Sequence, residues 1–152
     1  MDLVLLDAEL RRDEGVRYVP YFDQFGNPTV GIGHLLTGAP IPQGWTYPLT
    51  DDQVTQLENH DIQIALASLN LHLSWWSAMD EVRQRVIANM CFQLGINRLL
   101  GFHNTLASMQ AGNYAVAAAG MKNSLWYGQS GDRSIRLCQA MLTGVMPDEP
   151  VI

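Results

Sequence analysis

The chain has little positive charge and no long apolar run. It contains eight arginines but only one lysine, Lys122, and its formal net charge is −6 over 152 residues. The lack of a basic block argues against nucleic acid or an anionic membrane as the main partner. The apolar run nearest the start, Leu3 to Leu6, is interrupted by Asp7 and is too short for a signal sequence or a spanning helix. We therefore expect a protein made in the cytoplasm without a signal peptide, not inserted into a membrane, and delivered by another factor to any target elsewhere.

Cysteines and clustered histidines are also scarce. Only Cys91 and Cys138 occur, both within apolar, helix-like patterns, so we expect two buried free thiols rather than a disulfide. No histidine belongs to an HxH, HExxH or Cys/His pattern with ligand spacing. The four are His34, His60, His72 and His103. We expect no metal site and no cofactor.

The residues that are present indicate one globular domain spanning 1–152. Apolar residues make up 47% of the chain and charged residues 16%, which is enough for a hydrophobic core. Apolar positions recur at helical spacing over 3–13 and stop at Gly15, a usual helix C-cap. Residues that favour strands fill 16–36, and the proline-rich segment 37–49 is predicted to be a loop.

Helical signals dominate the rest of the chain. Thr50 and Gln53 form a capping box that begins a long helix ending near Leu71. A second helix is predicted from about Ser77 to Leu94, and its broad apolar stripe favours a buried central position. Shorter helices are predicted over 104–111, 113–122 and 132–143.

The predicted class is α+β, mostly α. A small hairpin or three-stranded sheet would form one lobe at 13–60, and residues 61–146 would form a helical lobe. The N-terminal helix, 1–12, would pack on the helical lobe, and the long helix would connect the two lobes.

One carboxylate interrupts the apolar stripe of the long helix. The stripe steps by three and four residues through Val54, Leu57, Asp61, Ile64, Ser68 and Leu71. Asp61 would then lie on the buried face, where an ionised carboxylate needs a partner. His34 is the candidate partner. The alternative is that Asp61 lies at the edge of the stripe and is solvated.

The stretch "DEGVRYVPYFDQFGNPTVGIGH", residues 13–34, places carboxylates among apolar side chains. Glu14 is followed by Asp23 in a segment that folds back, and by the hydroxyl of Thr29. Two carboxyl groups in unlike environments are what glycoside hydrolysis needs, one as a proton donor and one that stays ionised. The spacing alone is only suggestive of this chemistry.

These residues resemble the phage-type lysozymes, a family of muramidases related to the T-even phage lysozyme. The pattern "EG…Y…D…G…T.GIGHLL" carries the likeness, with the spacing of the family's catalytic triad at Glu14, Asp23 and Thr29. Four later segments add to it. They are "LTDDQVTQLENHD", "NMCFQLG", "GFHNTL" and "WYGQSGDR".

The resemblance implies a two-lobed lysozyme fold with a cleft between the lobes, and hydrolysis of the β-1,4 bond after N-acetylmuramic acid in peptidoglycan. Glu14 would be the general acid, and Asp23 with Thr29 would activate water so that the anomeric carbon is inverted. Arg133 would pair with Glu14, and Asp61 with His34. Substrate contacts are implied for Gly33, Leu35, Phe92 and Thr105.

Two departures concern substrate binding. Leu125 stands where the family usually has a basic residue, and Gly120 replaces a polar side chain that helps to bind substrate in well-known members. The negative charge is also unusual for an enzyme that acts on an anionic cell wall. It favours an enzyme that is tethered to a virion or otherwise delivered, for example through a holin-type pore. We expect a monomer. A catalytically degenerate peptidoglycan-binding module and a lytic transglycosylase are the alternatives.

Overall fold

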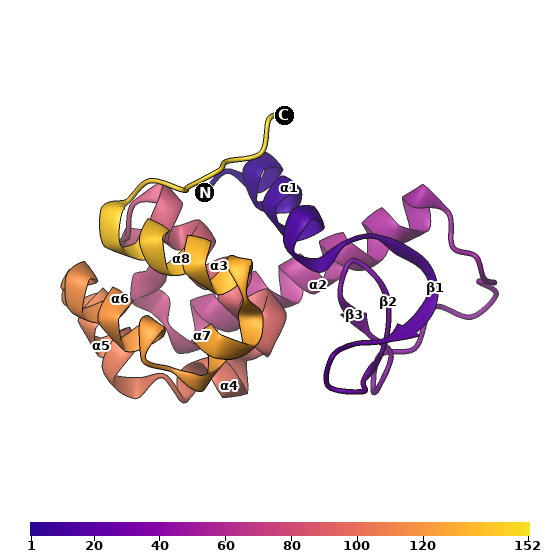
Figure 1. The fold of residues 1–152 in the computed structure, drawn as a ribbon. Coiled ribbons are helices and arrows are strands. Elements are labelled where there is room, and N and C mark those ends of the chain that lie inside the picture. Colours follow the sequence, from indigo (N-terminus) through magenta and orange to yellow (C-terminus); the bar gives the residue numbers. More distant parts are fainter.

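The computed structural model describes residues 1–152 as two lobes joined by a long helix (Figure 1). The N-terminal helix α1 spans Leu3–Glu14, and it ends because Gly15 adopts a left-handed φ of 71°. A three-stranded antiparallel sheet follows, in the order β1-β2-β3. Its strands are β1 (Arg17–Phe22), β2 (Pro28–Gly31) and β3 (His34–Leu35).

Helix α2, Asp51–His72, runs from the sheet into the helical lobe (Figure 1). The predicted capping box is present. The Thr50 hydroxyl accepts from the N–H of Gln53 at 3.1 Å, and the Gln53 side chain accepts from the N–H of Thr50 at 3.0 Å. The start of this helix is therefore determined within four residues.

The second lobe consists of helices that surround α3, Glu81–Leu94. Val86, Ile87 and Met90 of α3 are fully buried, which confirms the central position predicted for it. The other elements are a 3-10 helix at Ser74–Ala78, α4 (Ile96–Leu100), α5 (His103–Gln110), α6 (Tyr114–Lys122), α7 (Leu125–Ser130) and α8 (Asp132–Thr143). The structure is mostly helical with a small sheet, which confirms the predicted α+β class.

Helix α1 lies over the junction between α2 and the helical lobe, close to the end of the chain (Figure 1). Its buried residues Leu6 and Leu10 pack with Ile62 and Ala65 of α2 and Ala88 of α3. This contact places the last turn of α1, and therefore Glu14, at the boundary between the lobes.

One helix prediction is wrong in detail, and two short helices are missing from the predictions. The central helix begins at Glu81 rather than near Ser77, because the side chain of Asp80 accepts from the N–H of Arg83 and caps it there. Helices α4 and α7 were not predicted. Both have six residues or fewer, which is too short for a periodic apolar signal.

The predicted stripe of α2 is also wrong. Ile64 and Leu71 are 53% and 78% exposed. The buried positions are Val54, Leu57, Glu58, Ile62, Ala65 and Leu69. The buried face of α2 changes along the helix because α2 contacts both lobes. Its first turns pack on the sheet near Gly31, and its later turns pack on the helical lobe.

The two thiols differ in burial. Both are free, but only Cys91 is fully buried, whereas Cys138 is half-buried. Burial raises the pKa of Cys91 to about 11.

No helix of the chain combines the length and the apolar character needed to cross a membrane.

Candidate active site

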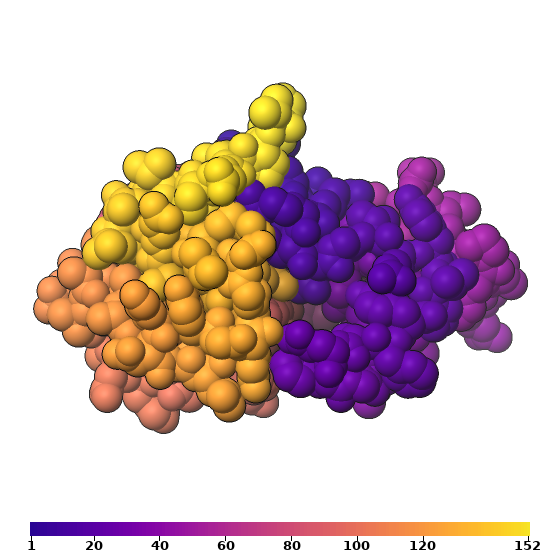
Figure 2. All heavy atoms as spheres, in the orientation of Figure 1, coloured from indigo at the N-terminus to yellow at the C-terminus, as the bar shows by residue number.

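A cleft of about 560 Å³ lies between the sheet and the helical lobe. Figure 2 shows it as a hollow between the indigo hairpin and the orange helices of the second lobe. Glu14, Asp23, Thr29 and Arg133 all line it. The structure thus brings together the three predicted catalytic residues and the predicted partner of Glu14.

Glu14 is held from the helical lobe. It is the last residue of α1, and its Oε1 accepts a hydrogen bond from Nη1 of Arg133 at 2.6 Å. Its side chain is 18% exposed, and that of Arg133 is 7% exposed. This charge-assisted bond fixes one carboxylate oxygen and leaves the other toward the cleft and Gly33.

A buried polar network lies behind Arg133, and the sequence analysis missed it. Nε of Arg133 donates to Oδ1 of Asn89 at 2.8 Å, and Nδ2 of Asn89 donates to Oδ2 of Asp13 at 2.9 Å. Arg136 donates to the other oxygen of Asp13 at 2.7 Å. The available signal was Asn89, an asparagine among the apolar residues of the central helix, because a buried amide needs hydrogen-bond partners.

Gly33 packs directly on Glu14. A Cβ atom at position 33 would lie 2.6 Å from both Cδ and Oε2 of Glu14, and the φ of Gly33 is +65°. Any side chain here would push the carboxyl group aside, and the backbone conformation would be strained as well. The glycine therefore contributes to the cleft by leaving space for Glu14.

Asp23 is held by the turn between β1 and β2. Its Oδ1 accepts from the N–H groups of Phe25 and Asn27, both at 2.9 Å, and its Oδ2 accepts from the Asn27 amide at 3.3 Å. Burial tends to raise the pKa of Asp23, but the N–H groups of Asn27 and Phe25 outweigh it and hold that pKa below its usual range. Asp23 is thus an ionised carboxylate in a fixed orientation.

Thr29 lies on β2, opposite Tyr21 of β1, and is 2% exposed. Its Oγ1 donates to the carbonyl of Asn27 at 2.8 Å. Because this bond uses the hydroxyl proton, the oxygen lone pairs remain free to accept a hydrogen bond from a water in the cleft.

The far wall of the cleft comes from the helical lobe. Phe92 and Gln93 of α3 and Trp126 of α7 line it, and Leu35 of β3 lines it from the sheet. Gln93 accepts from the indole N–H of Trp126 at 2.8 Å, which fixes both side chains.

Thr105 does not line the cleft that holds Glu14. It lies in an adjoining hollow of about 520 Å³, which shares Arg98 with the cleft. A Cβ atom at Gly120 would lie 2.4 Å from Oγ1 of Thr105. The absence of a side chain at position 120 therefore leaves the Thr105 hydroxyl room to face this hollow.

His34 and Asp61 form the expected pair, but neither residue lines the cleft that holds Glu14. Nδ1 of His34 lies 2.7 Å from Oδ2 of Asp61, and Nε2 lies 2.7 Å from the carbonyl of Ala39. The bond to Asp61 raises the pKa of His34, burial opposes this, and the Ala39 carbonyl adds to the rise. His34 is buried, whereas the side chain of Asp61 is 22% exposed, at the edge of the stripe rather than inside it.

Comparison with known proteins identifies the family. The model of the phage lysozyme family matches residues 11–138. The pre-baseplate central spike protein Gp5 of Enterobacteria phage T4 is 32% identical over 155 residues, which cover 89% of this chain and 27% of the spike protein.

Two further relatives agree with this match. Probable T4-type lysozyme 1 of Dictyostelium discoideum is 31% identical over 158 residues, covering 90% of this chain and 93% of that protein. Peptidoglycan hydrolase gp36 of Pseudomonas phage phiKMV is 31% identical over 126 residues, covering 83% of this chain and 14% of that protein. With the family model covering both walls of the cleft, the chain belongs to the phage lysozyme family.

Proposed function

We propose that the protein is a muramidase that hydrolyses the β-1,4 bond between N-acetylmuramic acid and N-acetylglucosamine in bacterial peptidoglycan, with inversion. The observation that carries the proposal is the arrangement of two carboxyl groups in one cleft. Glu14 is bonded to Arg133 on one side, and Asp23 is kept ionised by backbone N–H groups on the other. Family membership supports a glycoside hydrolase of this type.

In this proposal Glu14 is the general acid and protonates the leaving glycosidic oxygen. Asp23 accepts a hydrogen bond from a water molecule, which also donates to the free lone pairs of Thr29. The water then attacks the anomeric carbon from the face opposite the leaving group as the bond from this carbon to the leaving oxygen breaks, and Asp23 takes the proton that the water loses. Inverting glycosidases of this kind use carboxyl groups about 6.5–9.5 Å apart, so that the water fits between the second carboxylate and the sugar.

The remaining predicted residues support the reaction without taking part in it. Arg133 orients the Glu14 carboxyl group. The pairing of His34 with Asp61 and the Ala39 carbonyl holds the chain next to Gly33 and Leu35. Gly33, Leu35 and Phe92 would contact the glycan in the cleft, and Thr105 would contact it further along, in the adjoining hollow.

The biological role that we propose is cell-wall degradation by a phage lysin. Similarity to the T4 spike protein and to the phiKMV peptidoglycan hydrolase supports a virion-associated form, because both are far longer phage proteins of which this chain matches one part. The negative charge also fits a tethered enzyme, since tethering raises the local concentration at an anionic wall. A free endolysin that reaches the periplasm through a holin-type pore is the other form.

A turbidity assay on outer-membrane-permeabilised cells tests the activity. Glu14→Gln should lower the rate of lysis by about 10²–10⁴-fold, because the amide keeps the size of the side chain but has no acidic proton. Asp52→Asn, which neutralises an exposed carboxylate that does not line the cleft, is the matched control. Full lysis by folded Glu14→Gln would refute the assignment.

The product identifies the reaction. Hydrolysis releases a reducing sugar, whereas a lytic transglycosylase releases an anhydro sugar that is lighter by one water. Mass spectrometry of digested peptidoglycan separates the two. Proton NMR of fresh product should show the α-anomer, and a first-formed β-anomer would remove the proposed role of Asp23 and Thr29.

A further inference from the structure

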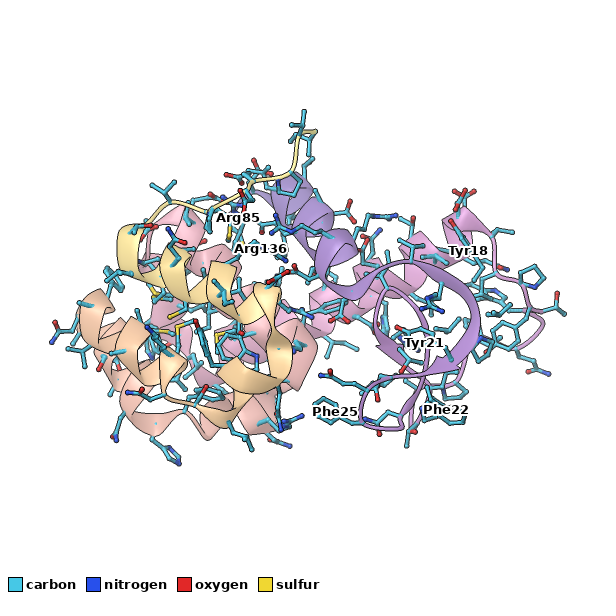
Figure 3. All side chains as sticks on the ribbon, viewed as in Figure 1. Tyr18, Tyr21, Phe22, Phe25, Arg85 and Arg136 are labelled. Carbon is cyan, nitrogen blue, oxygen red and sulfur yellow. The ribbon has the colours of Figure 1, made fainter.

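Two of the four phenylalanines of the chain lie exposed on one turn. Phe22 is 75% exposed and Phe25 is 53% exposed, and Asp23 lies between them in the sequence. In Figure 3, Phe25 lies on the side of the turn toward the helical lobe, and Phe22 lies on the side away from it. Both rings line the cleft that holds Glu14.

The fold does not use these two rings. Phe92 and Phe102 pack against the hydrophobic core, but Phe22 and Phe25 do not belong to it. Single exposed apolar side chains are common and need no explanation. Two exposed phenyl rings that flank the carboxylate of Asp23 and line one cleft are a different case, and we call Phe22 and Phe25 the apolar rim of this cleft.

Two hydrogen bonds hold the turn that carries the rim. The N–H of Phe25 donates to Asp23 at 2.9 Å, and the side chain of Gln24 donates to the carbonyl of Gln129 at 3.1 Å, which ties the turn to α7 across the cleft. The rings are therefore presented by a turn that is already ordered. A ligand that covers them would lose little conformational freedom of the backbone.

The charge of the protein limits what can bind here. The chain carries a net charge of −6, and the peptide stems of peptidoglycan carry carboxylates, so long-range attraction does not bring the two together. The glycan itself is uncharged along its pyranose rings, which present C–H groups on their faces. Aromatic rings can bury such faces without any charge.

We propose that Phe22 and Phe25 form a sugar-stacking rim, an additional contact for the glycan strand beside the reacting bond. The inference rests on the proposed muramidase function and adds a source of glycan affinity in a protein whose net charge is negative. The rim would contact pyranose faces on the sheet side of the cleft, next to the carboxylate of Asp23.

The test uses glycan strands from which the peptide stems have been removed by an amidase, so that only the sugars and their lactyl carboxylates remain. These carboxylates add no long-range attraction to a protein of net charge −6. KM and kcat are measured from released reducing ends for Phe22→Ala, Phe25→Ala, Phe22→Tyr and Phe25→Tyr. Leu71→Ala and Leu142→Ala are matched controls, because these side chains are 78% and 52% exposed and lie outside the cleft.

Each alanine variant of the rim should raise KM by about tenfold, the loss expected when part of a covered phenyl side chain is removed. The effect on kcat should be smaller than the effect on KM. The tyrosine variants should keep a KM within about twofold of the wild type, because the ring is retained. The tenfold difference should persist at high salt, since stacking is not screened.

An unchanged KM in both alanine variants, or an equal rise in the two controls, would overturn the inference. So would a wild-type dimer in sedimentation experiments that Phe22→Ala abolishes, because the rim would then be a contact between copies. Binding of the same strands is also measured by calorimetry, and the Glu14→Gln protein is compared with the same protein carrying Phe22→Ala or Phe25→Ala. If the wild type cleaves no peptidoglycan, the muramidase proposal fails, whereas the calorimetric comparison still decides whether the rim binds glycan.

Discussion

Glu14 and Arg133 are 119 residues apart in the sequence, yet Nη1 of Arg133 donates to Oε1 of Glu14 at 2.6 Å. The bond joins the last residue of α1 to the first turn of α8. Since Asn89 of α3 holds Nε of the same guanidinium, three helices determine where the Glu14 carboxyl group lies. The position of the proposed acid thus depends on the packing of the helical lobe.

Asn89→Ala tests this dependence. The variant leaves Nε of Arg133 and one oxygen of Asp13 without their partner in the interior, so we expect a loss of about 1–3 kcal/mol in the free energy of unfolding. We also expect a lower kcat, because Arg133 is no longer held in place. Chemical denaturation and the turbidity assay measure the two effects. Asn97→Ala, at an exposed position of α4, should change neither. Wild-type kcat in Asn89→Ala would show that Arg133 needs no support from α3.

Gly33→Ala should lower the rate of lysis, whereas a glycine-to-alanine change at a similar backbone conformation away from Glu14 should lower only the stability. A left-handed alanine costs about 1–2 kcal/mol, and its Cβ would in addition lie 2.6 Å from the Glu14 carboxyl group. Gly38→Ala is a matched control, because Gly38 has a φ of +78° but no atom within 4 Å of the added Cβ.

Both variants should therefore show a fall in melting temperature, measured by calorimetry, and the fall should be at least as large for Gly33→Ala because of its clash with Glu14. Only Gly33→Ala should lose most of its lytic rate. Equal activity in the two variants would mean that Glu14 moves aside without consequence, which would argue against its role as the general acid.

The pairing of His34 should make stability depend on pH. Both ring nitrogens face oxygen acceptors, so the pairing favours the doubly protonated ring, and the pKa of His34 is raised above its value in the unfolded chain. The stabilisation is therefore complete below the unfolded pKa of about 6.5 and is lost as the pH rises through the higher folded pKa.

Asp61→Asn should remove this contribution. Because Asp61 is partly exposed, we expect a cost of about 1–3 kcal/mol near pH 6, less than for a fully buried pair. The difference from the wild type should shrink above the folded pKa of His34, and denaturant titrations at several pH values measure it. His60→Gln, at an exposed position, is the control. A difference that stays constant with pH would exclude titration of His34 as its cause.

Glu58 should weaken the fold at alkaline pH. It is buried between α1 and α2, where burial, the hydrogen bond to Asp7 and the charge of Asp7 raise its pKa to about 8. A carboxyl group with a raised folded pKa contributes most below its unfolded pKa, near 4.3. That contribution falls as the pH rises through about 8.

Glu58→Gln keeps the shape and the neutral state of the protonated side chain. We expect it to melt close to the wild type at pH 5 and several degrees above it at pH 9. Thermal unfolding at both values, with the exposed Asp52→Asn as control, is the measurement. A variant that is less stable than the wild type at pH 9 would show that the ionised carboxylate is instead stabilised by Arg11.

Local signals in the sequence were sufficient for the elements next to the site. Gly15 ends α1 directly after Glu14, and the capping box at Thr50 begins α2, because each signal acts over only a few residues. Glu14, Asp23 and Thr29 were found from their spacing and from the family resemblance. Their roles as acid and water-holding groups remain proposals.

What the sequence could not determine depends on partners far away in the chain. Periodicity shows which side chains are apolar but not which lobe they face, so the buried face of α2 was misplaced where the helix passes from the sheet to the helical lobe. The burial of Glu58 was missed for the same reason. Asn89 became part of the site only because α1 and α8 pack against α3, which brings Asp13 and Arg133 to its side chain. Long-range packing decides such contacts, because no local rule specifies which charged group meets which amide.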